Sequence, residues 1–392
     1  MTGNAYIEVD FRQRAKHGQR APGDVFLSKK LKAEDRIISV LSDGLGSGVK
    51  ASVLATLTAT MGVKYATSFR DIRKSAATIM ETLPVCSVRK ISYSTFTIAD
   101  VDGEGAARVI EHGNPPFVLL RDGKHVPVPT ETLVLEQWQD RPLTSAQLTL
   151  EPGDRLVFVS DGVTQSGIGE ASMPLGWGDE SAVALMLEKV KAKPDLSAGR
   201  LAQALVDQAM RNDRLRPKDD ISCAVLYFRS PRRLLVMTGP PFSKERDGEL
   251  VEIALSYPGR KAICGGTTAS IISRGLGREV TVDLGDLDPD VPPPSRMEGV
   301  DLITEGTLTM AHLAELLEHS GPDVELPPNA VGDLLELMLE SDIIEFVVGT
   351  RINEAHQDPN IPVQLDLRRN IVKKIAQLLE EKHLKETRVR LL

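Results

Sequence analysis

The chain has 392 residues, of which 41% are hydrophobic and 26% charged, a mixture typical of folded domains, and its length predicts two or three of them. Only 4% of the residues are aromatic and the formal net charge is −8, which argues against base stacking and against a phosphate backbone as the main partner, so we expect no nucleic acid. Three widely spaced cysteines, no signal-like start and no apolar run of about 18 residues predict a cytoplasmic protein without a membrane partner.

The first half of the chain, residues 1–230, alternates short apolar strands with helical stretches. Turns such as Asp102-Gly103 join neighbouring strands, which favours antiparallel pairing. We therefore expect an α+β domain, an antiparallel β-sandwich flanked by helices. Its strands are predicted at 36–42, 91–99, 106–111, 116–120, 155–160 and 221–228, and its helices at 48–67, 70–82, 181–192 and 198–212.

The second half, residues 231–392, has a net charge of −9 against +1 for residues 1–230, and this asymmetry supports a domain boundary at Ser230–Arg233. Its strands and helices alternate, which predicts an α/β domain with a mainly parallel sheet. The segment Leu284–Glu298 is rich in proline and aspartate and is predicted to be a surface loop. Strands are expected at 234–237, 261–264, 279–283, 301–304 and 343–348, and helices near 244–256, 269–272, 308–319, 330–341 and 366–385.

Aspartates recur in the first half at the edges of predicted strands. Four positions share this placement: Asp24, Asp43, Asp161 and the pair Asp219-Asp220. Two of them lie in the same tripeptide, Ser-Asp-Gly, at 42–44 and 160–162. Carboxylates that converge from rigid strands supply the oxygen ligands that hard divalent cations require, and a following glycine lets a backbone carbonyl approach. A single Asp-Gly is accounted for as well by a turn, but the four positions together favour a metal site.

Residues 20–228 resemble the metal-dependent 2C-type protein serine/threonine phosphatases. Within these they are similar to the bacterial branch typified by the stage II sporulation protein E phosphatase and the sigma-factor stress regulators. The resemblance implies a phosphatase domain over residues 1–230 that hydrolyses phosphoserine or phosphothreonine without a covalent phospho-enzyme. It rests on Gly-Asp at 23–24, SDGLGSGVKAS at 42–52, YSTF at 93–96, GNPPFVLLRDG at 113–123, SDGVTQ at 160–165 and KDDIS at 218–222.

The resemblance also implies a cofactor and a role for each acid. Two or more Mn²⁺ or Mg²⁺ ions would be held by Asp43, Asp161 and Asp219, with the backbone carbonyl of Gly44 as a further ligand. Asp24 matches an acid that acts through a metal-bound water. Asp220 corresponds to a supporting position outside the ligand set.

Other positions in the first half leave alternatives open. Arg20 could hold the substrate phosphate or be a solvated surface arginine. His112 is expected to pack in the Gly-Asn-Pro-Pro turn rather than act as an acid. The segment Thr164–Ser181 could be a substrate flap, with Trp177 touching a partner protein, or a plain surface loop. Relatives suggest a phosphorylated partner of the anti-anti-sigma type and a possible homodimer.

In the second half, small and polar residues follow the predicted strands. Ligands of open α/β sheets bind beyond the carboxyl ends of the strands, so these residues predict a site for a small anionic ligand. Tight turns and helix capping account for the same residues equally well. The candidate residues are Gly265, Gly266, Thr267, Thr268, Glu305 and Arg351.

These patterns favour a metal-dependent protein phosphatase in bacterial signalling, with residues 231–392 as a regulatory or sensor domain. One alternative is a catalytically silent phosphatase fold that serves as a ligand-responsive scaffold. A second alternative makes residues 231–392 an enzyme in their own right, although no nucleophile–base pair or metal cluster stands out there.

Overall fold

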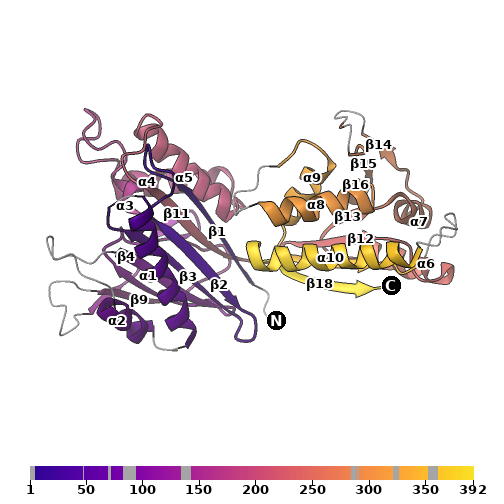
Figure 1. The fold of residues 1–392 in the computed structure, drawn as a ribbon, viewed down its shortest axis with the longest axis horizontal. Helices are drawn as coiled ribbons and strands as arrows, with labels where there is room; N and C mark the ends of the chain where they lie inside the picture. The colour runs from indigo at the N-terminus through magenta and orange to yellow at the C-terminus, as the bar shows by residue number, and fades with distance from the viewer. Residues whose placement is uncertain are drawn as a thin grey trace. The chain divides into compact units, whose positions relative to one another are not determined.

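Two units make up the chain, Met1–Ser230 and Pro231–Leu392 (Figure 1). The computed structural model describes residues 5–46, 48–68, 72–82, 94–133, 143–283, 288, 291–320, 326–351 and 361–392. Within them, no helix combines the length and the apolar character needed to cross a lipid bilayer.

Two antiparallel sheets form the first unit. Within the described residues one sheet has the strand order β1-β11-β10-β6-β7 and the other β2-β3-β4-β5-β9-β8. The strands are β1 (Tyr6–Arg14), β2 (Val25–Leu31), β3 (Arg36–Gly44), β4 (Ser94–Asp102), β5 (Ala106–His112), β6 (Val118–Arg121), β7 (Lys124–Val126), β8 (Thr130–Leu133), β9 (Leu143–Thr149), β10 (Arg155–Val159) and β11 (Ile221–Arg229).

Helices cover the outer faces of this sandwich (Figure 1). Because successive side chains of a strand point to opposite faces, β11 serves two cores. Its Cys223 and Val225 pack beneath α4 (Asp179–Ala192) and α5 (Ala198–Asn212), whereas Ala224 and Leu226 fill the space between the sheets. The other sheet packs against α1 (Val49–Ser68) and α2 (Ile72–Thr82). The predicted antiparallel sandwich with flanking helices is confirmed.

The second unit contains one mixed sheet with the order β14-β15-β16-β13-β12-β17-β18. The last five strands in that order are parallel to one another, and β14 and β15 are antiparallel. The strands are β12 (Arg233–Thr238), β13 (Arg260–Cys264), β14 (Thr281–Val282), β15 (Ser295–Met297), β16 (Val300–Thr304), β17 (Ile343–Val348) and β18 (Glu386–Leu391).

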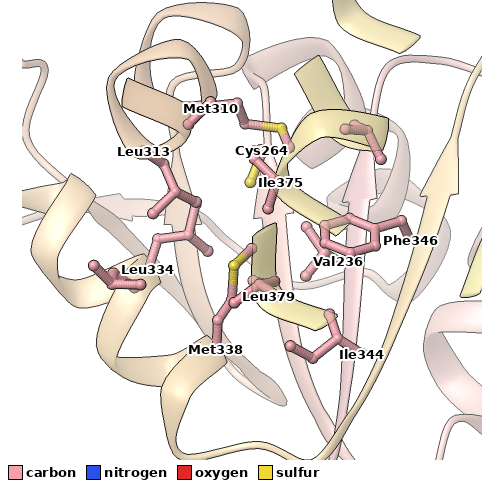
Figure 2. Close-up of a cluster of buried hydrophobic side chains, with 14 of the residues drawn as sticks. Val236, Cys264, Met310, Leu313, Leu334, Met338, Ile344, Phe346, Ile375 and Leu379 are labelled. Atoms are coloured by element: carbon pink, nitrogen blue, oxygen red, sulfur yellow. The ribbon is translucent and has the colours of Figure 1, made fainter. Parts of the chain in front are cut away.

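The helices of this unit lie on both faces of the sheet, as the chain crosses over between parallel strands. One face carries α6 (Asp247–Ser256), preceded by the short 3-10 turn Lys244–Arg246, and α7 (Gly266–Leu276). The other carries α8 (Thr307–His319), α9 (Ala330–Leu339) and α10 (Ile361–His383). Figure 2 shows the core under these three helices, where Phe346 and Leu379 are fully buried. The predicted α/β domain with a mainly parallel sheet is confirmed.

Two details of the second unit differ from the sequence prediction. Part of the segment predicted as a surface loop, Ser295–Met297, is the strand β15, which pairs with β16. The chain also continues after α10 into β18, an edge strand with alternating polar and apolar residues that pairs with β17 and that the sequence prediction does not include. The strand β15 has only three residues, and it depends on a partner strand that its own composition does not indicate.

Candidate metal centre

Four acidic segments meet at one end of the sandwich because of the strand register. Asp43 lies near the end of β3, opposite Thr95 of β4. Asp24 immediately precedes β2, whose first residue, Val25, pairs with Ser42, so the two acids come from neighbouring strands.

The other sheet contributes acids at the same end. Asp161 begins the short helix α3 (Asp161–Thr164) directly after β10, and Asp219 and Asp220 precede β11. Because β10 and β11 are antiparallel, with Val159 opposite Cys223, the end of one strand meets the beginning of the other.

Each residue of the repeated Ser-Asp-Gly tripeptide has its own structural task. The serines are fully buried and link neighbouring strands: Ser42 Oγ lies 2.6 Å from Ser94 Oγ, and the Ser160 hydroxyl accepts the Ser222 N–H at 3.0 Å. The glycines permit close approach. A Cβ on Gly44 would lie 2.2 Å from the Ala51 carbonyl oxygen, and one on Gly162 would lie 2.0 Å from the carbonyl oxygen of the acid at 220. The aspartate between them is thereby held at the sheet edge.

Burial and mutual repulsion make the charged form of these carboxylates unfavourable. Burial, followed by the charges of Asp24 and Asp161, raises the pKa of Asp43. Burial is also the largest cause that raises the pKa of Asp24, which is 2% exposed. Carboxylates placed this close together favour either protonation or a bound cation.

Three carboxylate oxygens have no hydrogen-bond partner of good geometry in the described residues, although the hydroxyls of Ser222 and Ser160 lie close enough to Asp24 to oppose the rise of its pKa. The three oxygens are both those of Asp24 and Oδ1 of Asp161, all of them buried. An all-oxygen, anionic donor set with unpaired buried oxygens fits a hard divalent cation. Among the described residues, no three His, Cys, Asp or Glu side chains already surround a single point as metal ligands. The chemistry of the donors therefore fits Mn²⁺ or Mg²⁺, and the number of ions is not fixed by their arrangement.

Asp220 is a support for the site rather than a free carboxylate. It is 3% exposed, and its two oxygens accept the backbone N–H groups of Lys16 and Gly23, each at 2.9 Å. Burial raises the pKa of Asp220, and these two hydrogen bonds oppose that rise. The carboxylate thereby ties the segment before Asp24 to the start of β11.

Several polar residues outside the predicted site complete the surroundings. Lys16 Nζ lies 3.7 Å from Asp219 Oδ1. Gln165 Nε2 donates to Asp161 Oδ2 at 3.0 Å. Gln13 Nε2 donates to the backbone carbonyl of Asp24 at 2.8 Å. Gln165 belongs to the SDGVTQ motif and could have been found there, whereas the other two depend on the pairing of β1 with β11.

The other predicted residues of the first unit, Arg20, His112 and Trp177, differ in their exposure and contacts. Arg20 is exposed and makes no hydrogen bond or ion pair with described residues. His112 is 9% exposed with its ring centroid 5.6 Å from that of Phe96, a packing position. Trp177 is half-buried and packs on the core beneath α4 and α5, so a large part of its ring is inaccessible to a partner.

The candidate residues of the second unit lie beyond the carboxyl ends of its parallel strands. Gly265 precedes α7, and Gly266, Thr267 and Thr268 form the first turn of that helix. Glu305 instead accepts the N–H groups of Leu308 and Thr309, and so caps α8. Arg351 Nη2 lies 3.4 Å from Asp247 at the start of α6, and its Nη1 is buried and makes no hydrogen bond with the described residues.

The comparison with protein families finds a match within the first unit. The family model for Stage II sporulation protein E (SpoIIE) matches residues 33–229, just over half of the chain. The comparison with curated proteins found no match. Among solved structures, the SpoIIE phosphatase domain from Bacillus subtilis, in a crystal form without domain swapping, is 19% identical with a TM-score of 0.45, and the match covers 59% of this chain and 95% of that one.

Two further structures show similar values. The PP2C phosphatase domain of Bacillus subtilis SpoIIE with a fragment of its regulatory domain is 21% identical with a TM-score of 0.48, covering 58% of this chain and 64% of that one. The RsbU and RsbW domains of Rv1364c from Mycobacterium tuberculosis are 18% identical with a TM-score of 0.46, covering 64% and 68%. On the evidence of the family model, which spans every acid from Asp43 to Asp220, the chain belongs to the SpoIIE family of PP2C-type phosphatase domains.

Proposed function

We propose that the first unit is a Mn²⁺- or Mg²⁺-dependent protein phosphatase that removes phosphate from phosphoserine or phosphothreonine. The observation that carries the proposal is the gathering of four acidic segments at one end of the sandwich, where Asp24 is buried and where burial and the charge of Asp24 raise the pKa of Asp43. Membership of the SpoIIE family supports this class of reaction.

In this proposal Asp43, Asp161 and Asp219 bind the cations together with the carbonyl of Gly44, and Asp24 lies beside them. The bound cations supply activation of a water and neutralisation of charge on the phosphoryl oxygens. The strand edges fix the positions of the acids, so the site does not have to be ordered by the substrate.

The neighbouring residues position these acids and the substrate. Asp220 fastens the segment that leads to Asp24, and Gln165 orients Asp161 through a hydrogen bond of 3.0 Å. Lys16 places its ammonium group beside Asp219, whereas Arg20 contacts none of the acids in the described residues. We therefore assign the substrate phosphoryl group to Lys16 in preference to Arg20.

A phosphorylated protein is the substrate class that the surroundings support. The segment that follows Asp161 exposes two large apolar side chains, Ile168 at 41% and Leu175 at 88%. Exposed apolar residues beside a site are suited to contact a protein surface. A small protein of the anti-anti-sigma type, phosphorylated on one serine, is the expected partner in signalling.

The second unit is proposed to regulate the first through a bound ligand. Support comes from its doubly wound sheet, since such sheets bind ligands beyond the carboxyl ends of their strands. The regulatory role and the phosphatase activity are separate claims, because each rests on residues of a different unit.

The test is hydrolysis of an aryl phosphate by the full chain with Mn²⁺, with Mg²⁺ and with EDTA. We expect turnover that requires a divalent cation and falls at least about 100-fold in Asp219→Asn. Asp179→Asn, an exposed aspartate at the start of α4, is the matched control and should retain wild-type turnover. Turnover that persists in EDTA, or that is equal in the two variants, contradicts the proposal.

A further inference from the structure

The carboxyl edge of the second unit's sheet carries three features that can bind an anion: a helix N-terminus, a buried hydroxyl and a guanidinium. The parallel strands follow the spatial order β16-β13-β12-β17-β18, so the first strand of the unit is central and the chain winds outward in both directions. The helix α7 reaches the edge from one face and α10 belongs to the other face. In such folds this edge is where ligands bind.

The first feature of the edge is the N-terminus of α7, which has no cap from a side chain. Its N-cap residue is Gly265, and Gly266 and Thr267 are exposed. The N–H groups of a first helical turn have no partner within the helix and attract an anion. The neighbouring helix α8 differs, because Glu305 already accepts two of its N–H groups.

The second feature is a buried hydroxyl without a partner. Thr268 is 1% exposed, and its Oγ1 makes no hydrogen bond with the described residues. A Cβ built on Gly265 would lie 3.7 Å from that oxygen and 3.8 Å from the Cα of Gly306. The hydroxyl of Thr268 therefore lies beside Gly265, the N-cap residue of α7, and Gly306 lies beside the same glycine. A buried hydroxyl without a hydrogen bond destabilises the fold, unless a ligand supplies the missing hydrogen bond.

The third feature is the guanidinium of Arg368, from α10. Its Nη1 would lie 2.6 Å from a Cβ on Gly239, at the end of β12, so the absence of a side chain there makes room for it. It also interacts electrostatically with Glu305, at the end of β16. Gly239 and Glu305 follow the strands on either side of β13, so Arg368 lies at the same edge of the sheet as the start of α7.

From these features we infer that the α7 N-terminus, Thr268 and Arg368 form a binding site for the phosphate group of a small phosphate monoester. A guanidinium and several N–H groups at one edge of the sheet offer more donors than the two oxygens of a carboxylate can use, and match the oxygens of a phosphate better. Arg351 does not belong to this site, because its ion pair with Asp247 directs it to α6.

The test is calorimetric titration of the full chain with inorganic phosphate in the presence of EDTA. Under these conditions the clustered aspartates of the first unit repel a phosphate dianion. We expect saturable binding in the millimolar range or tighter, and weaker binding of acetate. Arg368→Gln should weaken phosphate binding at least about tenfold, since it removes a charge-assisted hydrogen bond. Its exposed neighbour provides the matched control, and Arg369→Gln should change the affinity less than about twofold.

A second variant separates binding from folding. A Cβ on Gly266 meets no atom within 4 Å, so Gly266→Asp fits the structure. An aspartate in a first helical turn favours the helix, yet its charge repels an anion at the same place. We expect an unchanged or higher unfolding temperature together with at least about tenfold weaker phosphate binding. No saturable binding by the wild type at about 10 mM phosphate, or equal affinities in the Arg368 and Arg369 variants, overturns the inference.

Discussion

The adjacent acids Asp219 and Asp220 give the sharpest test of how the site is built, because they are assigned opposite roles. Asp219 is 46% exposed and is proposed to bind a cation, whereas Asp220 is buried and holds two backbone N–H groups. In Asp220→Asn, the single carbonyl oxygen of the asparagine can accept only one of the two N–H groups, from Lys16 or Gly23, in the present geometry. The amide N–H₂ then faces the other N–H group. Losing one charge-assisted hydrogen bond and leaving one N–H unpaired costs about 2–3 kcal/mol.

Part of this loss of stability is offset. Burial and the charge of Asp219 raise the pKa of Asp220, so removing its charge relieves an unfavourable interaction. A net loss of about 1–2 kcal/mol lowers the unfolding temperature of a domain of this size by roughly 2–8 °C. Asp219→Asn removes an exposed ion pair at 3.7 Å, worth at most about 1 kcal/mol, and also reduces repulsion. The carbonyl oxygen of the asparagine can still accept the Asp220 N–H, which bonds Asp219 Oδ1 at 3.0 Å.

The two variants should therefore separate stability from activity. In calorimetric unfolding, Asp220→Asn loses stability and Asp219→Asn does not. In the metal-dependent hydrolysis of an aryl phosphate, Asp219→Asn loses turnover at least about 100-fold and Asp220→Asn retains more of it. The reasoning is refuted if Asp219→Asn unfolds earlier than Asp220→Asn, or if Asp220→Asn is equally inactive at wild-type stability.

Other contacts lead to three further predictions. Lys16→Ala should raise KM for an aryl phosphate by about tenfold, whereas Arg20→Ala should change it less than twofold. A larger increase of KM in Arg20→Ala than in Lys16→Ala, measured by steady-state kinetics, would assign the phosphate contact to Arg20 instead. Gly162→Ala forces a Cβ to within 2.0 Å of a carbonyl oxygen and should lower stability by at least about 2 kcal/mol, while Gly248→Ala, with open space around it, should not. Burial raises the pKa of Glu111 to about 8, above its usual 4.5, so the folded protein binds this proton more tightly and stability falls as pH rises from about 4.5 to about 8. Glu111→Gln should remove that part of the fall in denaturant unfolding at pH 5 and pH 9, and an unchanged pH dependence contradicts the assignment.

Much of the first unit could be predicted because its signals are local. Each Ser-Asp-Gly tripeptide lies at the end of an apolar strand, and a turn at that place is readable from the sequence alone. In the second unit, the strand Ile343–Val348 has its predicted bounds, since a short run rich in β-branched and aromatic residues strongly favours a buried strand.

The contacts that complete the sites depend on pairings distant in sequence. The strand β1 reads as mixed polar and apolar residues, and it becomes a strand because Tyr6 pairs with Arg229 at the other end of the unit. That pairing brings Lys16 beside Asp219, so a lysine with no motif of its own joins the acids. The sequence indicates residue types at strand ends, whereas the topology decides which ends are neighbours.

In the second unit, too, some site residues can be predicted from the sequence and others depend on the topology. The glycines and threonines at 265–268 lie beyond the end of a strand, as their sequence predicts. Arg368 could not be found in this way, because it comes from α10, more than a hundred residues later, and approaches Gly239 only through the crossover to the other face of the sheet. Glu305 is predicted as a ligand from its residue type and its place after a strand, and in the structure its carboxylate accepts two N–H groups of α8.

The central claim is that the acids hold divalent cations that carry phosphoserine hydrolysis. It is tested most directly by phosphate release from a phosphoserine peptide, with wild type and Asp43→Asn assayed in Mn²⁺ and in EDTA. The account predicts phosphate release by the wild type in Mn²⁺ only, and none above background in the variant. Release by the wild type in EDTA, or by Asp43→Asn at a rate near that of the wild type, would contradict it.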